Sequence, residues 1–240
     1  MSRFTKSFIE FIKRPDVHIA ISNYDFNYVY ERLKIEKVAV ASDFTSMLYE
    51  AGINSLPYLK YVPTRYMSNG EIPVKSITLP KQITSIGDFA FVRCTDLEHI
   101  DINDGCRTIY ATAFAGCTSL KQIDIPSSVT TIWHNAFEHC SSLETVTFAP
   151  NSKLTLIYDE AFKNCTKLKE IELPEGLTQL GNDVFLRTSL KRIRLPQSLN
   201  VIGDDIVGVP YLPNLTVECY HDTAGETWAQ NNNCIVSYLD

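Results

Sequence analysis

Cysteine and histidine are the residues of this chain best suited to metal binding or nucleophilic chemistry, and the sequence holds seven cysteines and five histidines. A structural zinc site needs four converging ligands, often supplied by C-x-x-C pairs, and no C-x-x-C occurs. Four of the cysteines instead recur at regular spacing: Cys94, Cys117, Cys140 and Cys165. We therefore predict a column of buried thiols that act as small apolar side chains, with no metal site.

The familiar catalytic motifs do not occur in the sequence. It contains no G-x-S-x-G, no P-loop, no H-E-x-x-H and no G-x-G-x-x-G. His99 and His139 fall at outward or edge positions of different repeats, and no acid–nucleophile pair lies in register with them. We expect solvated histidines, no cofactor and no enzymatic activity.

The cysteine spacing is part of a longer repeat. The phrase C-T-S-L at residues 117–120 returns as C-S-S-L at 140–143, and a period of this size indicates a solenoid. A strand-like Ile or Val recurs at steps of 23, 23, 23, 25 and 22 residues: Ile77, Ile100, Ile123, Val146, Ile171 and Ile193. A second apolar residue two positions on predicts a short strand, and the Pro that follows in four copies ends it because Pro has no N–H for the ladder. An Ala-Phe pair and the Cys then predict one core shared by stacked copies.

This pattern, L-x-x-I-x-[IL]-P-x-x-[VLI]-x-x-I-G-x-x-A-F-x-x-C-[TS]-x-L, resembles the BspA-type (treponemal) leucine-rich repeats over roughly residues 74–216. The tail T-A-G-E-T-W-A-Q-N-N-N-C-I-V (223–236) is similar to the closing segment of that family. The resemblance implies an α+β fold, a right-handed solenoid with a parallel sheet on its concave side. We expect six repeats over 73–216 and a closing segment over 217–240, with Trp228 as its plug.

Residues 1–72 lack the period and predict a small, mostly helical cap over the apolar end of the first repeat. The apolar spacing predicts helices over 2–14, 25–35 and 43–51. The stretch E-A-G-I-N-S-L-P-Y-L-K-Y-V-P (50–63) is similar to segments that precede these repeats in short proteins encoded by phages of gut bacteria. That resemblance implies an intracellular protein acting in a bacterial host.

The net charge of −6 is unevenly distributed, because residues 1–73 carry +1 and residues 74–240 carry −7. Nucleic-acid binding needs clustered Lys and Arg, so the acidic repeats favour a protein partner with a basic surface. No run of 18 apolar residues predicts a membrane span, and the N-terminus lacks the apolar core of a signal peptide. Together with the free thiols, these features predict a cytoplasmic location, in the host cell if the chain is phage-encoded. Secretion would require a signal peptide that had been removed.

Two outward stripes are candidates for binding a partner. The first is the strand face, which is acidic in the middle and basic at its C-terminal end. Its two columns are Thr78, Asp101, Asp124, Thr147, Glu172 and Arg194, and Ser76, His99, Gln122, Thr145, Glu170 and Arg192. The alternative is that these side chains form an ordinary solvated face.

The second stripe is a departure from the repeat pattern. Where the pattern has Gly, the outer repeats keep it as Gly87, Gly181 and Gly203, and the three central repeats have Tyr110, Trp133 and Tyr158. Tyr and Trp are enriched in binding hot spots, so this aromatic stripe could contact a partner. Alternatively, the three rings stack on one another and stiffen the solenoid.

The expected function is that of a non-enzymatic protein-binding module. Its most specific form is a phage-encoded inhibitor of a bacterial defence or regulatory protein. The alternative is a surface or secreted adhesin of a gut bacterium, which an N-terminus generated by signal cleavage would support. No feature of the sequence indicates an oligomeric state.

Overall fold

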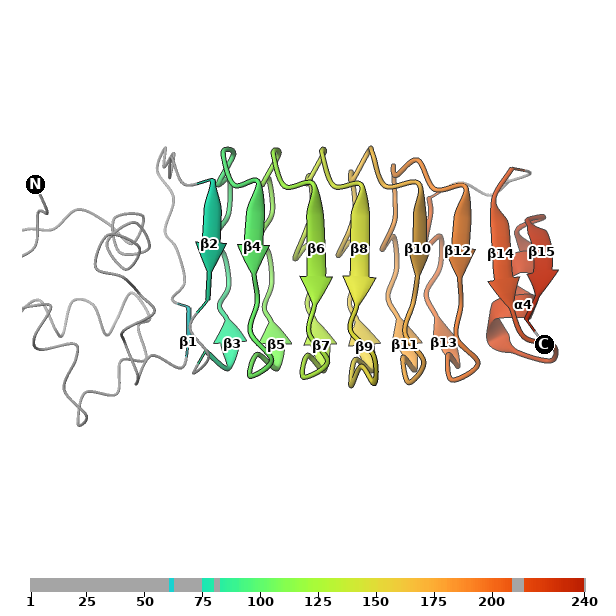
Figure 1. Cartoon of the computed structure of the whole chain (residues 1–240). Helices are drawn as coiled ribbons and strands as arrows, with labels where there is room; N and C mark the ends of the chain where they lie inside the picture. Colours follow the sequence, from blue (N-terminus) through green and yellow to red (C-terminus); the bar gives the residue numbers. More distant parts are fainter. Residues whose placement is uncertain (1–60, 63–74, 80–82, 209–213, 240) are drawn as a thin grey trace, which may run out of the picture.

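The computed structural model describes residues 61–62, 75–79, 83–208 and 214–239. In these ranges the chain is a parallel β-solenoid of about six turns, with one short helix near its C-terminal end (Figure 1). The predicted solenoid with a parallel sheet is confirmed. The predicted cap over residues 1–72, with its three helices, lies outside the described residues except for Tyr61–Val62. No helix in the described ranges is long and apolar enough to cross a membrane.

The first strand of each turn forms what we call the strand face, at the front of Figure 1. These strands are β2 (Ser76–Thr78), β4 (His99–Asp101), β6 (Gln122–Ile125), β8 (Thr145–Phe148), β10 (Glu170–Glu172) and β12 (Arg192–Arg194). The paired strands are parallel, and their register matches the sequence alignment of the repeats: Ile123 lies opposite Val146, for example. The alternation places Ile123 in the core and its neighbours outside, as predicted.

A second parallel sheet, which the sequence analysis did not predict, is formed by two-residue strands. Its order is β1 (Tyr61–Val62), β3 (Ser85–Ile86), β5 (Thr108–Ile109), β7 (Thr131–Ile132), β9 (Leu156–Ile157), β11 (Gln179–Leu180) and β13 (Val201–Ile202). Strands this short carry no recognisable alternation. The apolar column of this sheet is fully buried at Ile86, Ile109, Ile132, Ile157 and Leu180, and Ile202 at its end is half-buried.

The C-terminal segment continues the strand face. Strand β14 (Thr216–Cys219) pairs with β12, and β15 (Ile235–Tyr238) pairs with β14, both in parallel. Helix α4 (Ala224–Asn231) connects them, and Trp228 on this helix is buried at 9% exposure among the core residues. Trp228 thus occupies the position expected of the plug. The predicted boundary between residues 216 and 217 falls within β14.

The core consists of ladders that run through successive turns. Five phenylalanines stack with ring centroids 5.1–5.7 Å apart and planes within 13° of parallel: Phe91, Phe114, Phe137, Phe162 and Phe185. The four cysteines of the predicted column are buried, and none of them forms a disulfide. The thiols of Cys117, Cys140 and Cys165 donate to a carbonyl of the turn before, as when Cys140 Sγ donates to the Phe114 carbonyl at 3.2 Å. Burial raises the pKa of the Cys140 thiol. The predicted thiol column is confirmed.

Candidate functional site

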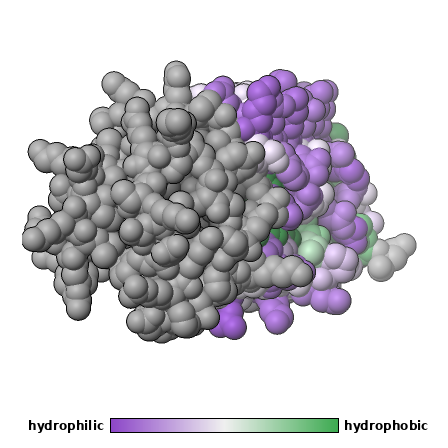
Figure 2. Space-filling view, turned by 60° about the vertical axis from the view of Figure 1, so that its left-hand side comes forward, coloured by the Kyte–Doolittle hydropathy of each residue, from purple (hydrophilic) through white to green (hydrophobic). Residues whose placement is uncertain are grey.

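The outward side chains of the strand face form two columns because the strands pair residue for residue. One column contains Ser76, His99, Gln122, Thr145, Glu170 and Arg192, and β14 and β15 extend it with Thr216 and Ile235. The other contains Asp101, Asp124, Thr147, Glu172 and Arg194, followed by Glu218 and Ser237, and Thr78 is in backbone register with Asp101. The predicted strand-face residues therefore lie on one continuous surface, whose visible part in Figure 2 is mostly hydrophilic.

The hydrogen-bond ladder of the strand face is interrupted at two places. Strands β4 and β6, and again β8 and β10, lie side by side without being paired, which leaves three separate ladder segments. The second sheet is continuous across all seven strands. The break between β8 and β10 coincides with the 25-residue repeat, which is two residues longer than those before it. The break between β4 and β6 falls at an ordinary 23-residue step, so the extra length does not account for both interruptions.

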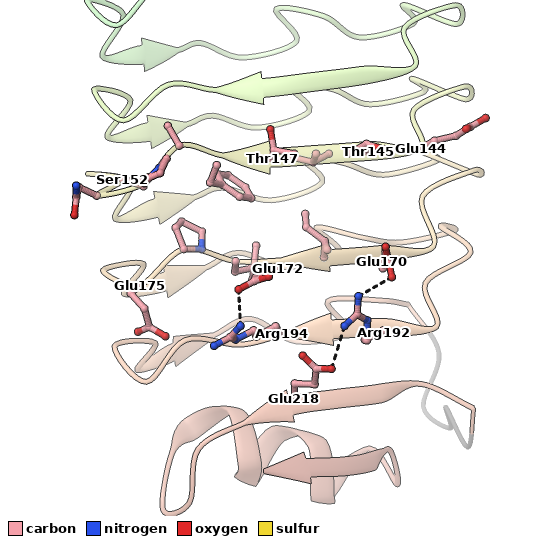
Figure 3. A pocket seen from close by; sticks show the side chains of 18 residues that line it. Glu144, Thr145, Thr147, Ser152, Glu170, Glu172, Glu175, Arg192, Arg194 and Glu218 are labelled. Carbon is pink, nitrogen blue, oxygen red and sulfur yellow. Dashed lines mark hydrogen bonds and ion pairs between the residues drawn. The ribbon is translucent and has the colours of Figure 1, made fainter. Parts of the chain in front are cut away.

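A groove of about 720 Å³ opens at the break between β8 and β10. Its lining includes five glutamates and two arginines: Glu144, Glu170, Glu172, Glu175, Glu218, Arg192 and Arg194 (Figure 3). The remaining lining comes from β8, from the loop over residues 149–152, which the two extra residues lengthen, and from Ile171, Leu173 and Pro174 in and just after β10. The groove thus combines charged side chains with apolar ones such as Phe148 and Leu173.

The two arginines of the groove are held by glutamates. Arg192 binds Glu170 at 2.8 Å and Glu218 at 3.3 Å, and Arg194 binds Glu172 at 2.6 Å. The hydrogen bond to Glu170, followed by that to Glu218, raises the pKa of the Arg192 guanidinium. The charges of both arginines are therefore offset by carboxylates, so this end is less basic than the sequence alone suggested.

The acidic middle of the face lies over a second depression of about 370 Å³, lined by Asp101, Asp104 and Asp124. Asp124 accepts hydrogen bonds from the Thr147 hydroxyl and, at 3.0 Å, from Gln122 Nε2. Within the described ranges no basic side chain forms an ion pair with any of the three aspartates. Nor does any group of His, Cys, Asp or Glu in those ranges have the arrangement of a metal site. The middle of the face carries uncompensated negative charge.

The edge where the strands begin has a different charge pattern, which the sequence analysis did not identify. Lys75 lies 3.1 Å from Glu98, Glu98 lies 3.7 Å from Lys121, and a depression of about 610 Å³ farther along is lined by Lys167, Lys169 and Lys191. The hydrogen bond from Lys75 is the main reason why the pKa of Glu98 is lowered. Glu144 and Glu170 line the same depression, so the strand beginnings carry an excess of lysines interspersed with glutamates. The strand ends carry mostly carboxylates, apart from Arg194, and the face is bipolar in this net sense.

The aromatic stripe of the three central repeats is a stack of half-buried rings. The centroids of Tyr110 and Trp133 are 5.9 Å apart, and those of Trp133 and Tyr158 are 4.6 Å apart, with planes about 20° from parallel. This is the mutual stacking given above as the alternative to partner contact. The faces of Trp133 are covered by its neighbours, so a partner would meet ring edges. Direct binding by the stripe stays a prediction.

Gly181 occupies the stripe position in the turn after Tyr158, and the close approach of these two turns requires a glycine there. A Cβ on Gly181 would lie 2.4 Å from Asp159 Oδ1 and 2.8 Å from the Tyr158 carbonyl carbon. The same carboxylate accepts a hydrogen bond of 2.8 Å from the Asn182 N–H. There is no room for a side chain at this position, whereas the turns before it accommodate large rings.

The fold and surface define a protein of stacked repeats whose strands present an open polar face. The BspA type leucine-rich repeat family matches the chain in six copies over residues 64–153 and 149–223, and the chain belongs to this family. The family is typical of protein-binding or surface proteins.

Solved structures of similar fold come from several bacteria. The leucine-rich repeat protein TpLRR of T. pallidum is 28% identical, with a TM-score of 0.46, and the match covers 65% of this chain and 61% of that one. The pneumococcal vaccine antigen PcpA is 19% identical, with a TM-score of 0.52 and coverage of 75% and 64%. A leucine-rich repeat protein of Bacteroides ovatus is 26% identical, with a TM-score of 0.34 and coverage of 69% and 51%. The chain spans less than two thirds of each of these proteins, and no curated protein matches it.

Proposed function

We propose that this chain is a non-enzymatic protein-binding module that receives a protein partner on its strand face. The observation that carries the proposal is the acidic middle of that face, where Asp101, Asp104 and Asp124 line a depression and form no ion pair with a side chain of the described ranges. Clustered carboxylates of this kind favour a partner with Lys or Arg side chains opposite the strand ends.

The bipolar charge pattern adds an orientation to this contact. Lys169 and Lys191 at the strand beginnings favour acidic groups of the partner, and the aspartates at the strand ends favour basic ones. A partner rotated by half a turn in the plane of the face would oppose like charges and lose affinity. A standard interface buries about 800 Å² on each partner, so the grooves and adjoining loops contribute to the contact as well.

The cellular role we propose is inhibition of a bacterial host protein in the host cytoplasm, on the basis of the phage-like stretch at residues 50–63. The second candidate is adhesion at a cell surface, which the membership of a family typical of surface proteins favours. Fractionation of the native cells, with the chain detected by antibody, separates the two: the first predicts a cytosolic pool, the second a surface or medium pool.

The test begins with capture of the partner by the tagged full chain from native cells, followed by measurement of its Kd. Asp101→Asn and Asp124→Asn keep shape and remove charge, and Asp204→Asn, an exposed position beyond β13, is the matched control. Exposed charge pairs are worth about 0.2–1 kcal/mol each, so the double variant should bind about 2- to 30-fold more weakly. The difference from the control should shrink in high salt. Equal affinity of the double variant and the control would rule out the acidic middle as the contact.

A further inference from the structure

Strand β15 is the last strand of the strand face, and in the described residues nothing pairs with its outer edge. The Ile235 N–H donates to the Leu215 carbonyl and the Leu239 N–H donates to the Cys219 carbonyl, both at 2.9 Å. Because successive residues of a strand alternate in direction, the N–H and C=O groups of Val236 and Tyr238 point away from β14. These four groups form an open hydrogen-bonding edge.

The edge lacks the features that keep natural edge strands from pairing. Such strands usually carry a Lys, a Pro, a bulge or an inward-pointing charge. Strand β15 reads Ile-Val-Ser-Tyr and has no charged residue and no Pro. Ile235, on the outward side, is 52% exposed. The other strands of the same sheet carry charged outward residues: Glu170, Glu172, Arg192, Arg194 and Glu218.

We propose that β15 pairs antiparallel with β15 of a second copy of the chain, about a two-fold axis at Ser237. In this register Val236 of each copy lies opposite Tyr238 of the other, and each such pair exchanges two backbone hydrogen bonds. Ile235 then lies opposite Leu239 of the second copy, which gives two apolar cross-strand pairs. The two four-stranded sheets become one sheet of eight strands.

A second copy fits this edge better than an unrelated strand, because a two-fold axis pairs the open hydrogen-bonding groups of both copies at once. When a strand pairs antiparallel with its own copy, similar residues come to lie near each other. If the strand carries charged side chains, like charges then lie opposite one another and destabilise the pair. The uncharged outward positions of β15, Ile235 and Ser237, avoid that repulsion, whereas Glu170 and Glu172 of β10 would not. A four-residue strand buries little area, so the dimer should be weak and concentration-dependent.

The first test is sedimentation velocity of the full chain over a range of concentrations. The dimer fraction of the wild type should rise with concentration. Ile235→Lys introduces a charge of the kind that protects natural edges, and should weaken dimerisation at least tenfold. Thr216→Lys is the matched control, because Thr216 is the register partner of Ile235 one strand inside the sheet, and its dimer should persist. A wild-type chain that stays monomeric at every concentration overturns the proposal, as does equal loss of the dimer in both variants.

The second test traps the two-fold register. In the proposed pair Ser237 lies opposite Ser237 of the second copy as a non-hydrogen-bonded pair, with Cα atoms about 4.5 Å apart, which a disulfide can bridge. Ser237→Cys should give a covalent dimer under mild oxidation of the native protein. Glu218→Cys, its register partner on β14, should not. Failure of Ser237→Cys to cross-link, or equal cross-linking of the control, would overturn the register.

Discussion

Replacing Trp133 by Gly decides whether the aromatic stripe supports the fold. The change restores the residue found in the outer repeats but removes the central ring of the stack. Two stacked pairs, with Tyr110 at 5.9 Å and with Tyr158 at 4.6 Å, are lost. Each aromatic pair is worth about 0.5–1.5 kcal/mol beyond its buried area, and Gly adds about 0.5–1 kcal/mol of backbone entropy cost. The free energy of unfolding should therefore fall by about 1.5–4 kcal/mol.

The assay is urea denaturation of the full chain followed by far-UV circular dichroism, with Trp133→Phe as the control. Phe keeps an aromatic ring in the stack, so this variant should recover most of the lost stability. An unchanged urea midpoint for Trp133→Gly would refute a supporting role for the stack. If the captured partner binds more weakly to well-folded Trp133→Phe, the stripe rather than the acidic middle of the strand face is the main contact.

Two further predictions concern the turn-to-turn contacts and the buried thiols. Gly181→Ala should destabilise the chain by about 1–3 kcal/mol or more, because its Cβ would lie 2.4 Å from Asp159 Oδ1; an unchanged urea midpoint would contradict that contact. Burial raises the pKa of the Cys140 thiol above its ordinary 9.0, so this thiol's contribution to stability is fully present below pH 9 and is lost as pH rises above it, by up to about 1.4 kcal/mol per unit. The free energy of unfolding should fall less steeply with rising pH in Cys140→Ala than in the wild type. In the native protein, a thiol reagent should modify half-buried Cys234, whose pKa is raised to about 11, before it modifies Cys140.

The repeat sequence by itself determined the solenoid, the positions of the strand-face strands and the buried columns. Each turn contacts mainly the turns before and after it, so a contact in space appears as a fixed spacing in the sequence. Phe114 and Phe137 are 23 residues apart, and their rings stack at 5.1 Å. The thiol column followed from the same spacing, and the aromatic stripe was visible as a departure from it.

Two backbone features, the second sheet and the left-handed residues that bond to the next turn, were determined only by the tertiary structure. Both depend on how each turn is placed against the next. The second sheet consists of two-residue strands that exist only because the neighbouring turns pair with them. Non-glycine residues such as Thr112 and Glu160 adopt left-handed backbone conformations at φ 59°, and their N–H groups donate to the carbonyls of the following turn.

The charge balance of the strand face was also a matter of tertiary structure. Arg192 is neutralised by Glu170 and Glu218 from the strands on either side, while Asp101 and Asp104 form no ion pair in the described ranges. The repeat pattern of the sequence predicts which residues face outward. Ion pairs and grooves depend on distances of a few ångströms between side chains of different turns, which the repeat pattern does not contain.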